Sequence, residues 1–173
     1  MAEPVMIVPY DLEWPKIFAR LRDDVSAVMG AVALRIEHVG STAVPGLVAK
    51  PVIDIDVVIS SELELQEAIS RLLLLGYSYA GERGIEGRHA FVQPMGLPTH
   101  HLYVCAADNP ELARHIAFRN HLITDRAASD AYGELKQELA RTFGEDREGY
   151  TNAKTAFIAD ILSKLAFRSG PQG

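Results

Sequence analysis

The stretch LRIEHVGSTAVPGLVAKPVIDIDVVI (residues 34–59) decides how the rest of the chain is interpreted. It predicts two strands, at 34–39 and 52–59, joined by a Gly-Ser turn and a loop that contains Pro and Gly. Asp54 and Asp56 lie two residues apart on the second strand, so their side chains point to the same face. The residues around them are apolar, which indicates a strand buried on both faces. Buried carboxylates are costly unless a cation or hydrogen bonds compensate them.

The composition is typical of a soluble globular protein with one domain, residues 1–173. Hydrophobic residues make up 48% of the chain and charged residues 23%, and the length suffices for a sizeable core. The formal net charge of −6 excludes a broad basic surface for nucleic acid, so nucleic acid is not an expected partner. A local basic groove remains open.

Cysteine content and apolar runs predict a cytoplasmic protein. The single cysteine, Cys105, excludes an internal disulfide and follows the apolar LYV, which favours a buried structural thiol over a nucleophile. The N-terminus lacks the basic and apolar regions of a signal peptide. No apolar run approaches the roughly 20 residues of a membrane helix, so we expect no membrane association.

The order of predicted elements indicates the α+β class. Apolar spacing predicts a helix at 14–29 that Gly30 ends, and Ser61 with Glu64 forms a capping-box pattern for a helix that runs to 75. We therefore expect a mixed sheet within about 1–106 and a helical part at about 107–168. The other predicted elements are strands at 77–80, 88–93 and 100–106, and helices at about 110–124, 129–143 and 146–167, before a frayed RSGPQG tail.

The paired acids suit divalent metal chemistry. Mg²⁺ and Mn²⁺ prefer oxygen ligands, and Asp54 and Asp56 on one face supply two carboxylates while leaving room for water and phosphate oxygens. Such a cation neutralises the charge that develops in phosphoryl transfer. The alternative is a pair of acids near a strand end that are solvated or paired with Lys50 or arginines.

The Gly40-Ser41 turn points to phosphate. A glycine and a small hydroxyl residue after a strand bring backbone N–H groups close to a phosphate, although Gly-Ser alone is a common turn. Its combination with Asp54 and Asp56 further along the chain is more specific. Lys50 either neutralises phosphate or is an exposed loop cation paired with a carboxylate.

This pattern of an apolar residue, Gly-Ser and a strand with Asp-x-Asp resembles the nucleotidyltransferase superfamily, with its DNA polymerase β-like fold. More narrowly, IEHVGSTAVPGLVAKPVIDIDVVI is similar to the GrpB family, as are YDLEWP before it and THHLYV, HIAFRNHL and YTNAKTAFI after it. The resemblance runs from about Val8 to about Leu165. It implies a mixed sheet flanked by helices, with a C-terminal helical segment. It also implies that Gly40 and Ser41 hold a nucleoside triphosphate and that Asp54 and Asp56 hold one or two magnesium ions.

The chain departs from the superfamily at the third carboxylate, which a later strand usually supplies. The corresponding segment, HHLYV at 100–104, contains no acid, and His101 or Tyr103 takes its place on one face. Imidazole is a poor magnesium ligand but suits manganese, zinc or phosphate contact, and His101 has the chemistry of a general base. A histidine pair in the core or at a strand end is the alternative for His100 and His101.

Two further cation positions follow from helical spacing. His115 and Arg119 lie four residues apart on one helix face, where they interrupt an apolar stripe, and Tyr150 and Lys154 repeat this spacing. Arg119 has the geometry to clamp a phosphate, and Lys154 the charge to bind one. A structural ion pair is the alternative for each.

The sequence therefore predicts a Mg²⁺- or Mn²⁺-dependent protein that transfers a nucleotidyl group from a nucleoside triphosphate to an unknown small-molecule or protein acceptor. One alternative is a non-catalytic nucleotide- or partner-binding module that lost the third carboxylate, and another is a metal-dependent phosphohydrolase. The predicted catalytic residues are Asp54, Asp56 and His101, and the predicted phosphate-binding residues are Gly40, Ser41, Lys50, Arg119 and Lys154.

Overall fold

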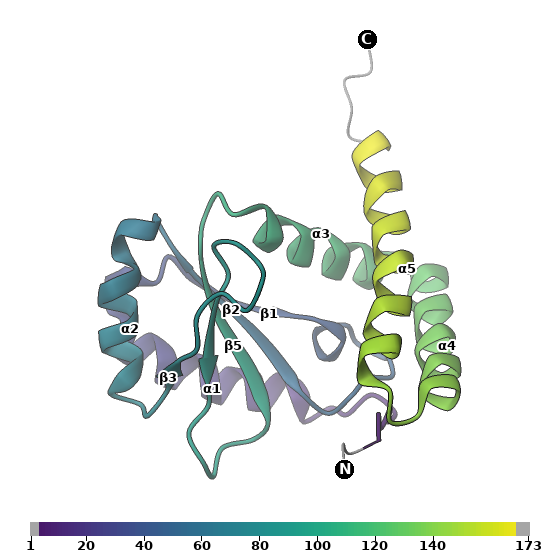
Figure 1. The fold of residues 1–173 in the computed structure, drawn as a ribbon, viewed down its shortest axis with the longest axis horizontal. Coiled ribbons are helices and arrows are strands. Elements are labelled where there is room, and N and C mark those ends of the chain that lie inside the picture. The colour runs from purple at the N-terminus through teal and green to yellow at the C-terminus, as the bar shows by residue number, and fades with distance from the viewer. Residues whose placement is uncertain (1–3, 169–173) are drawn as a thin grey trace.

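A five-stranded mixed sheet forms the centre of the protein (Figure 1). The structure, a computed structural model, describes residues 4–168. The sheet order is β1-β2-β5-β4-β3; β2 and β5 are parallel, and the other neighbours are antiparallel. The predicted α+β class and mixed sheet are confirmed. The strands are β1 Arg35–Val39, β2 Ile53–Ile59, β3 Ser78–Tyr79, β4 His89–Val92 and β5 His100–Ala106.

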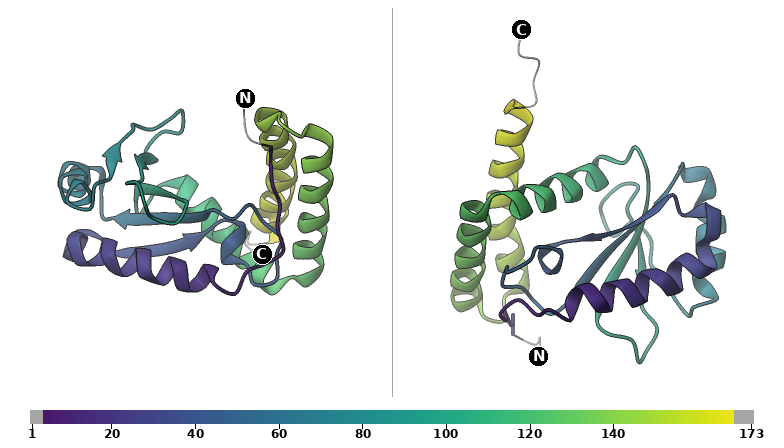
Figure 2. Two further views of the ribbon diagram at one scale, coloured as in Figure 1. Left: turned by 90° about the horizontal axis from the view of Figure 1, so that it is seen from below. Right: turned by 180° about the vertical axis from the view of Figure 1, so that it is seen from behind.

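Helices cover both faces of this sheet, and two further helices lie beside it. Helices α1 and α2 pack on one face, α3 crosses the other, and α4 and α5 lie side by side next to the sheet (Figures 1 and 2). Within residues 4–168, no helix is both long and apolar enough to cross a membrane. The helices are α1 Trp14–Met29, α2 Leu65–Leu73, α3 Pro110–Thr124, α4 Arg126–Phe143 and α5 Arg147–Arg168.

Strand β2 is buried on both faces, as its apolar sequence predicts. Its residues Ile53, Ile55, Val57 and Ile59 point into the main core, where α1 and α2 pack. Because side chains alternate, Asp54, Asp56 and Val58 face the opposite side, where Val58 packs with Cys105 and with Leu112 of α3. The two acids therefore lie on the face that α3 covers.

The lone cysteine is structural, as expected. Cys105 is 2% exposed, and burial, with the nearby charges of Asp56 and Glu62, raises the pKa of its thiol to about 12. A thiol with so high a pKa is protonated at neutral pH and is a weak nucleophile.

Several element boundaries differ from those predicted. A short 3₁₀ helix, Glu62–Glu64, precedes α2, which ends at Leu73 rather than at residue 75. Helix α4 begins at Arg126 instead of 129, because Asp125 caps it by accepting a hydrogen bond of 2.9 Å from the Ala128 N–H. The predicted frayed tail falls on 169–173, outside the described residues, except for Arg168.

Candidate active site

The register of three strands brings the paired acids beside other polar residues. In the antiparallel pair β1–β2, Asp54 lies opposite Val39, at the residue before Gly40. In the parallel pair β2–β5, Asp54 lies opposite His101 and Asp56 lies opposite Tyr103. The Gly-Ser turn, the two acids and the polar side of β5 therefore share one place in the fold.

Asp56 has the features of a cation ligand. Its side chain is 1% exposed, and within residues 4–168 its Oδ1 atom is buried without a hydrogen-bond partner. The Asp54 side chain on the same face is 31% exposed. These donors fit Mg²⁺, which takes one or two protein carboxylates and completes its shell with water and phosphate. In the described part of the chain, no group of three or more His, Cys, Asp or Glu residues is arranged to hold a metal.

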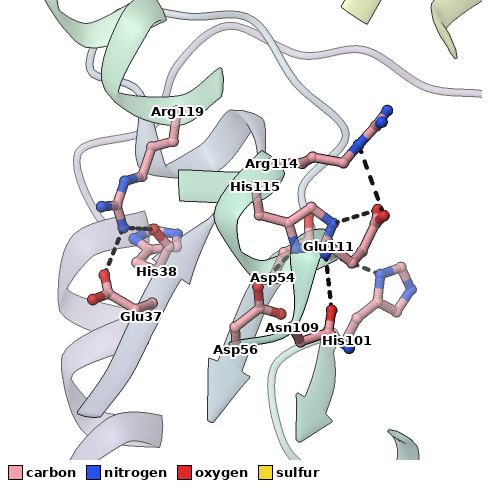
Figure 3. Close-up of polar contacts among 10 residues, drawn as sticks. All are labelled: Glu37, His38, Asp54, Asp56, His101, Asn109, Glu111, Arg114, His115 and Arg119. Atoms are coloured by element: carbon pink, nitrogen blue, oxygen red, sulfur yellow. Dashed lines mark hydrogen bonds and ion pairs between the residues drawn. The ribbon is translucent and has the colours of Figure 1, made fainter. Parts of the chain in front are cut away.

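His115 of α3 is a site residue that the sequence interpretation did not select. Its Nδ1 lies 2.7 Å from Asp56 Oδ2 and its Nε2 lies 3.3 Å from Glu111 Oε1 (Figure 3). Burial lowers the pKa of His115, but the hydrogen bond and charge of Asp56, together with Glu111, outweigh burial and raise it. One feature of the sequence could have identified His115: it is a polar residue that interrupts the apolar stripe of this helix.

The two adjacent histidines of β5 have different environments. His100 is buried, and its Nε2 lies 2.6 Å from the Tyr77 hydroxyl, so it is a core histidine, as the alternative interpretation expected. The His101 side chain is 58% exposed, and its Nδ1 lies 2.9 Å from Asp54 Oδ1 (Figure 3). No carboxylate occupies β5 opposite either acid; His101 and Tyr103 do.

The Gly40-Ser41 turn lies directly against Asp54. Gly40 has a φ of 73°, in the left-handed region, and Ser41 begins the short 3₁₀ helix Ser41–Ala43. A Cβ atom added to Gly40 would overlap the Asp54 carboxylate. Glycine is therefore required here both by its backbone angle and by the close approach of the acid.

We expect Gly40→Ala to lower the free energy of unfolding by about 2–4 kcal/mol, from the positive φ and the clash with Asp54 together. Gly46→Ala is the matched control, because Gly46 has a φ of 81° and open space around the position of a Cβ. Urea unfolding of both variants measures the difference. If both variants lose the same free energy of unfolding, the Asp54 carboxylate does not clash with a side chain at position 40.

Three lysines, two of them predicted, lie against the rings of Tyr132 and Tyr150. The ammonium groups of Lys50 and Lys154 lie 4.6 and 5.0 Å from the centre of the Tyr150 ring. Burial and neighbouring positive charge lower the pKa of both lysines, against the opposing effect of Asp54. The third, Lys136, is 2% exposed and donates a hydrogen bond to the Val48 carbonyl. Such a cluster of like charges favours a bound anion.

Arg119, predicted to bind phosphate, forms the structural ion pair that was its alternative. Its Nη1 lies 2.8 Å from Glu37 Oε2 and 2.9 Å from the His38 carbonyl oxygen (Figure 3). These contacts join α3 to β1. The structure thus brings Gly40, Ser41, Asp54 and Lys154 together and places Arg119 at the edge of the group.

A cavity of about 280 Å³ runs from these residues toward α5. Its polar lining includes the Gly40-Ser41 turn, Asp54, His115 and Lys154, and neither Lys50 nor His101 borders it. Its apolar lining includes Phe118, Ile158 and Leu162. The cavity therefore offers anion-binding groups and an apolar wall to one ligand.

The fold is nucleotidyltransferase-like. The solved structure of the Cid1 poly(U) polymerase with MgGTP bound superposes with a TM-score of 0.55 over 78% of this chain and 44% of that chain. The sequence identity is 10%, so the likeness concerns the fold alone.

The chain belongs to the GrpB protein family, whose family model matches residues 4–164. The crystal structure of the conserved protein GrpB from Enterococcus faecalis superposes with a TM-score of 0.75 and 29% identity, over 91% of this chain and 99% of that chain. A UPF0157 protein of Pseudomonas aeruginosa is 36% identical over 166 residues, which cover 92% of this chain and 67% of that protein. The resemblance to the GrpB family that was noted in the sequence is thereby confirmed.

Proposed function

We propose that this protein is a Mg²⁺-dependent nucleotidyltransferase that moves a nucleotidyl group from a nucleoside triphosphate to an acceptor hydroxyl. The buried, unpartnered Oδ1 atom of Asp56 beside Asp54 is the observation that carries the proposal. An uncompensated carboxylate oxygen in a protein interior is costly, and a cation removes that cost. The nucleotidyltransferase-like fold supports the same interpretation.

Part of the nucleotide would occupy the 280 Å³ cavity, which is too small to enclose a whole nucleoside triphosphate. Backbone N–H groups of the Gly40-Ser41 turn, the Ser41 hydroxyl and the Lys154 ammonium hold the phosphates. Lys50, whose ammonium lies 4.6 Å from the centre of the Tyr150 ring, adds positive charge. Asp54 and Asp56 hold Mg²⁺, which when bound neutralises phosphate charge and polarises the phosphorus that is attacked. The base or sugar packs on the apolar wall of the cavity.

In the proposed reaction the acceptor oxygen forms a bond to the α-phosphorus of the nucleotide. The bond from the α-phosphorus to the oxygen that bridges it to the β-phosphorus breaks, and pyrophosphate leaves with the electron pair. The hydroxyl proton passes to the imidazole of His101, whose Nδ1 lies 2.9 Å from Asp54 Oδ1. His101 in this way serves in place of the third carboxylate.

The second candidate is a non-catalytic nucleotide-binding module. The observation that favours it is the polar side of β5, which presents His101 and Tyr103 to the two acids instead of a carboxylate. Calorimetric titration with ATP, GTP, CTP and UTP, each with and without Mg²⁺, tests both candidates. Pyrophosphate release with added acceptors then separates them, because the module binds nucleotide and releases none. Failure to bind any nucleotide with Mg²⁺ or Mn²⁺ would contradict both.

A further inference from the structure

A second, smaller cavity adjoins the first at Asp54. It has a volume of about 170 Å³ and shares Gly40, Asp54 and His115 with the lining of the larger cavity. Its own side is formed by Val39, Arg88 and Tyr103. Asp54 therefore borders two spaces, and a molecule in the smaller one lies next to a nucleotide in the larger.

Arg88 lines the smaller cavity, and the described part of the chain supplies it with no counter-ion. It directly precedes β4, and its guanidinium carbon lies 4.3 Å from the centre of the Tyr103 ring. Within residues 4–168, its Nε atom is buried without a hydrogen-bond partner, and no carboxylate forms an ion pair with it. Buried polar groups are normally hydrogen-bonded, so an orphaned guanidinium N–H in a cavity points to a ligand that accepts its hydrogen bond.

Within residues 4–168 no hydrogen bond or ion pair joins Arg88 to either nearby acid, although Asp56 Oδ1 also has no partner. Asp54 is paired with His101, and one oxygen of Asp56 is paired with His115. Arginine presents a planar fork of donors that matches a carboxylate or a phosphate, and stacking on Tyr103 fixes its plane. The chemistry of the pocket is therefore that of an oxyanion site.

The size of the pocket limits what enters it. An engineered protein cavity of about 150 Å³ accommodates benzene, so a space of this order takes a molecule with roughly six to ten non-hydrogen atoms. The formal net charge of −6 disfavours a nucleic-acid chain, whose backbone requires many cationic contacts. A small metabolite-sized anion fits both limits.

We infer that the smaller cavity is the acceptor subsite, and that it takes a small molecule with a hydroxyl group and a carboxylate or phosphate group. The oxyanion pairs with Arg88, and the hydroxyl faces Asp54. Its oxygen attacks the α-phosphorus, its proton passes to His101, and pyrophosphate leaves. The choice of acceptor rests on the proposed function. The pairing of an oxyanion with Arg88 does not.

Three probes of similar size test the inference: glycerate, glycerol 3-phosphate and uncharged glycerol. Each is titrated by calorimetry into the full chain, alone and with Mg²⁺ and a non-hydrolysable ATP analogue. We expect at least one of the two anions to bind and glycerol not to bind, and the comparison of the anions tells carboxylate from phosphate. Arg88→Gln should weaken anion binding by at least about tenfold, because a charge-assisted pair is lost.

Two further variants make the result specific. Arg126→Gln removes an arginine of α4 whose side chain is 87% exposed and borders neither cavity, and it should bind the anions like the native chain. Arg88→Lys keeps the charge without the fork and should bind with intermediate affinity. Equal binding of glycerol and the anions, native-like binding by Arg88→Gln, or no anion binding by the native chain would each overturn the inference. If the chain binds anions through Arg88 but binds no nucleotide, the oxyanion site at Arg88 stands and the proposed transferase function is wrong.

Discussion

Asp56→Asn is expected to weaken the binding of ATP in the presence of Mg²⁺ by about 100-fold, because a neutral amide replaces a charged metal ligand. The substitution keeps the size of the side chain and an oxygen that accepts the hydrogen bond of His115. Binding of ATP without Mg²⁺ should change little. Calorimetric titration of both proteins, with and without the metal, measures the effect.

Asp23→Asn is the matched control for this variant. The Asp23 side chain is 69% exposed on α1 and pairs only with its neighbour Arg22 in the described structure. Its substitution should leave both affinities unchanged. Equal Mg²⁺-dependent affinity of Asp56→Asn and the native chain would mean that Asp56 does not ligate the metal.

The second large effect is expected on stability, at Lys136. Burial and the charge of Lys154 lower the pKa of Lys136 from 10.5 to about 7 in the folded protein. Between pH 7 and pH 9 the folded protein loses this proton while the unfolded chain keeps it. The unfolded state then binds more protons, so the free energy of unfolding rises with pH across this window.

Lys136→Met removes this titration and keeps most of the volume. The stability of the native chain relative to the variant should therefore increase by about 2–3 kcal/mol from pH 6 to pH 9. Urea unfolding of both proteins at each pH measures the change. Lys16→Met, at a side chain that is 65% exposed, should show no such trend. Parallel curves for Lys136→Met and the native chain would show that Lys136 keeps its ordinary pKa.

The sequence predicted the sheet and the position of the paired acids because these depend on local patterns. The apolar run in 52–59 predicts β2, and spacing of two residues puts Asp54 and Asp56 on one face whatever surrounds them. Gly30 ends α1 as expected, since a left-handed residue stops a helix. The Gly-Ser turn lies close to the acids because β1 and β2 pair as neighbours.

The partners of the acids were not predictable in this way, because they depend on how distant elements pack. His115 reaches Asp56 only because α3 crosses the face of the sheet opposite α1, a contact between residues 59 positions apart. Helical spacing suggested a phosphate role for Arg119 as well as an ion pair, and the position of β1 supplied Glu37 for the ion pair. Lys136 joins the lysine cluster through the packing of α4 beside the loop at Val48, which no local pattern encodes.

The most direct test of the proposed site is a crystal structure of the full chain with Mn²⁺ and a non-hydrolysable ATP analogue. Manganese replaces magnesium at oxygen sites and is located by its anomalous scattering. We predict a manganese ion bound to carboxylate oxygens of both Asp54 and Asp56, with phosphate oxygens on the Gly40-Ser41 turn. An analogue bound away from this turn, or acids that hold only His101 and His115 at saturating metal and nucleotide, would contradict the account.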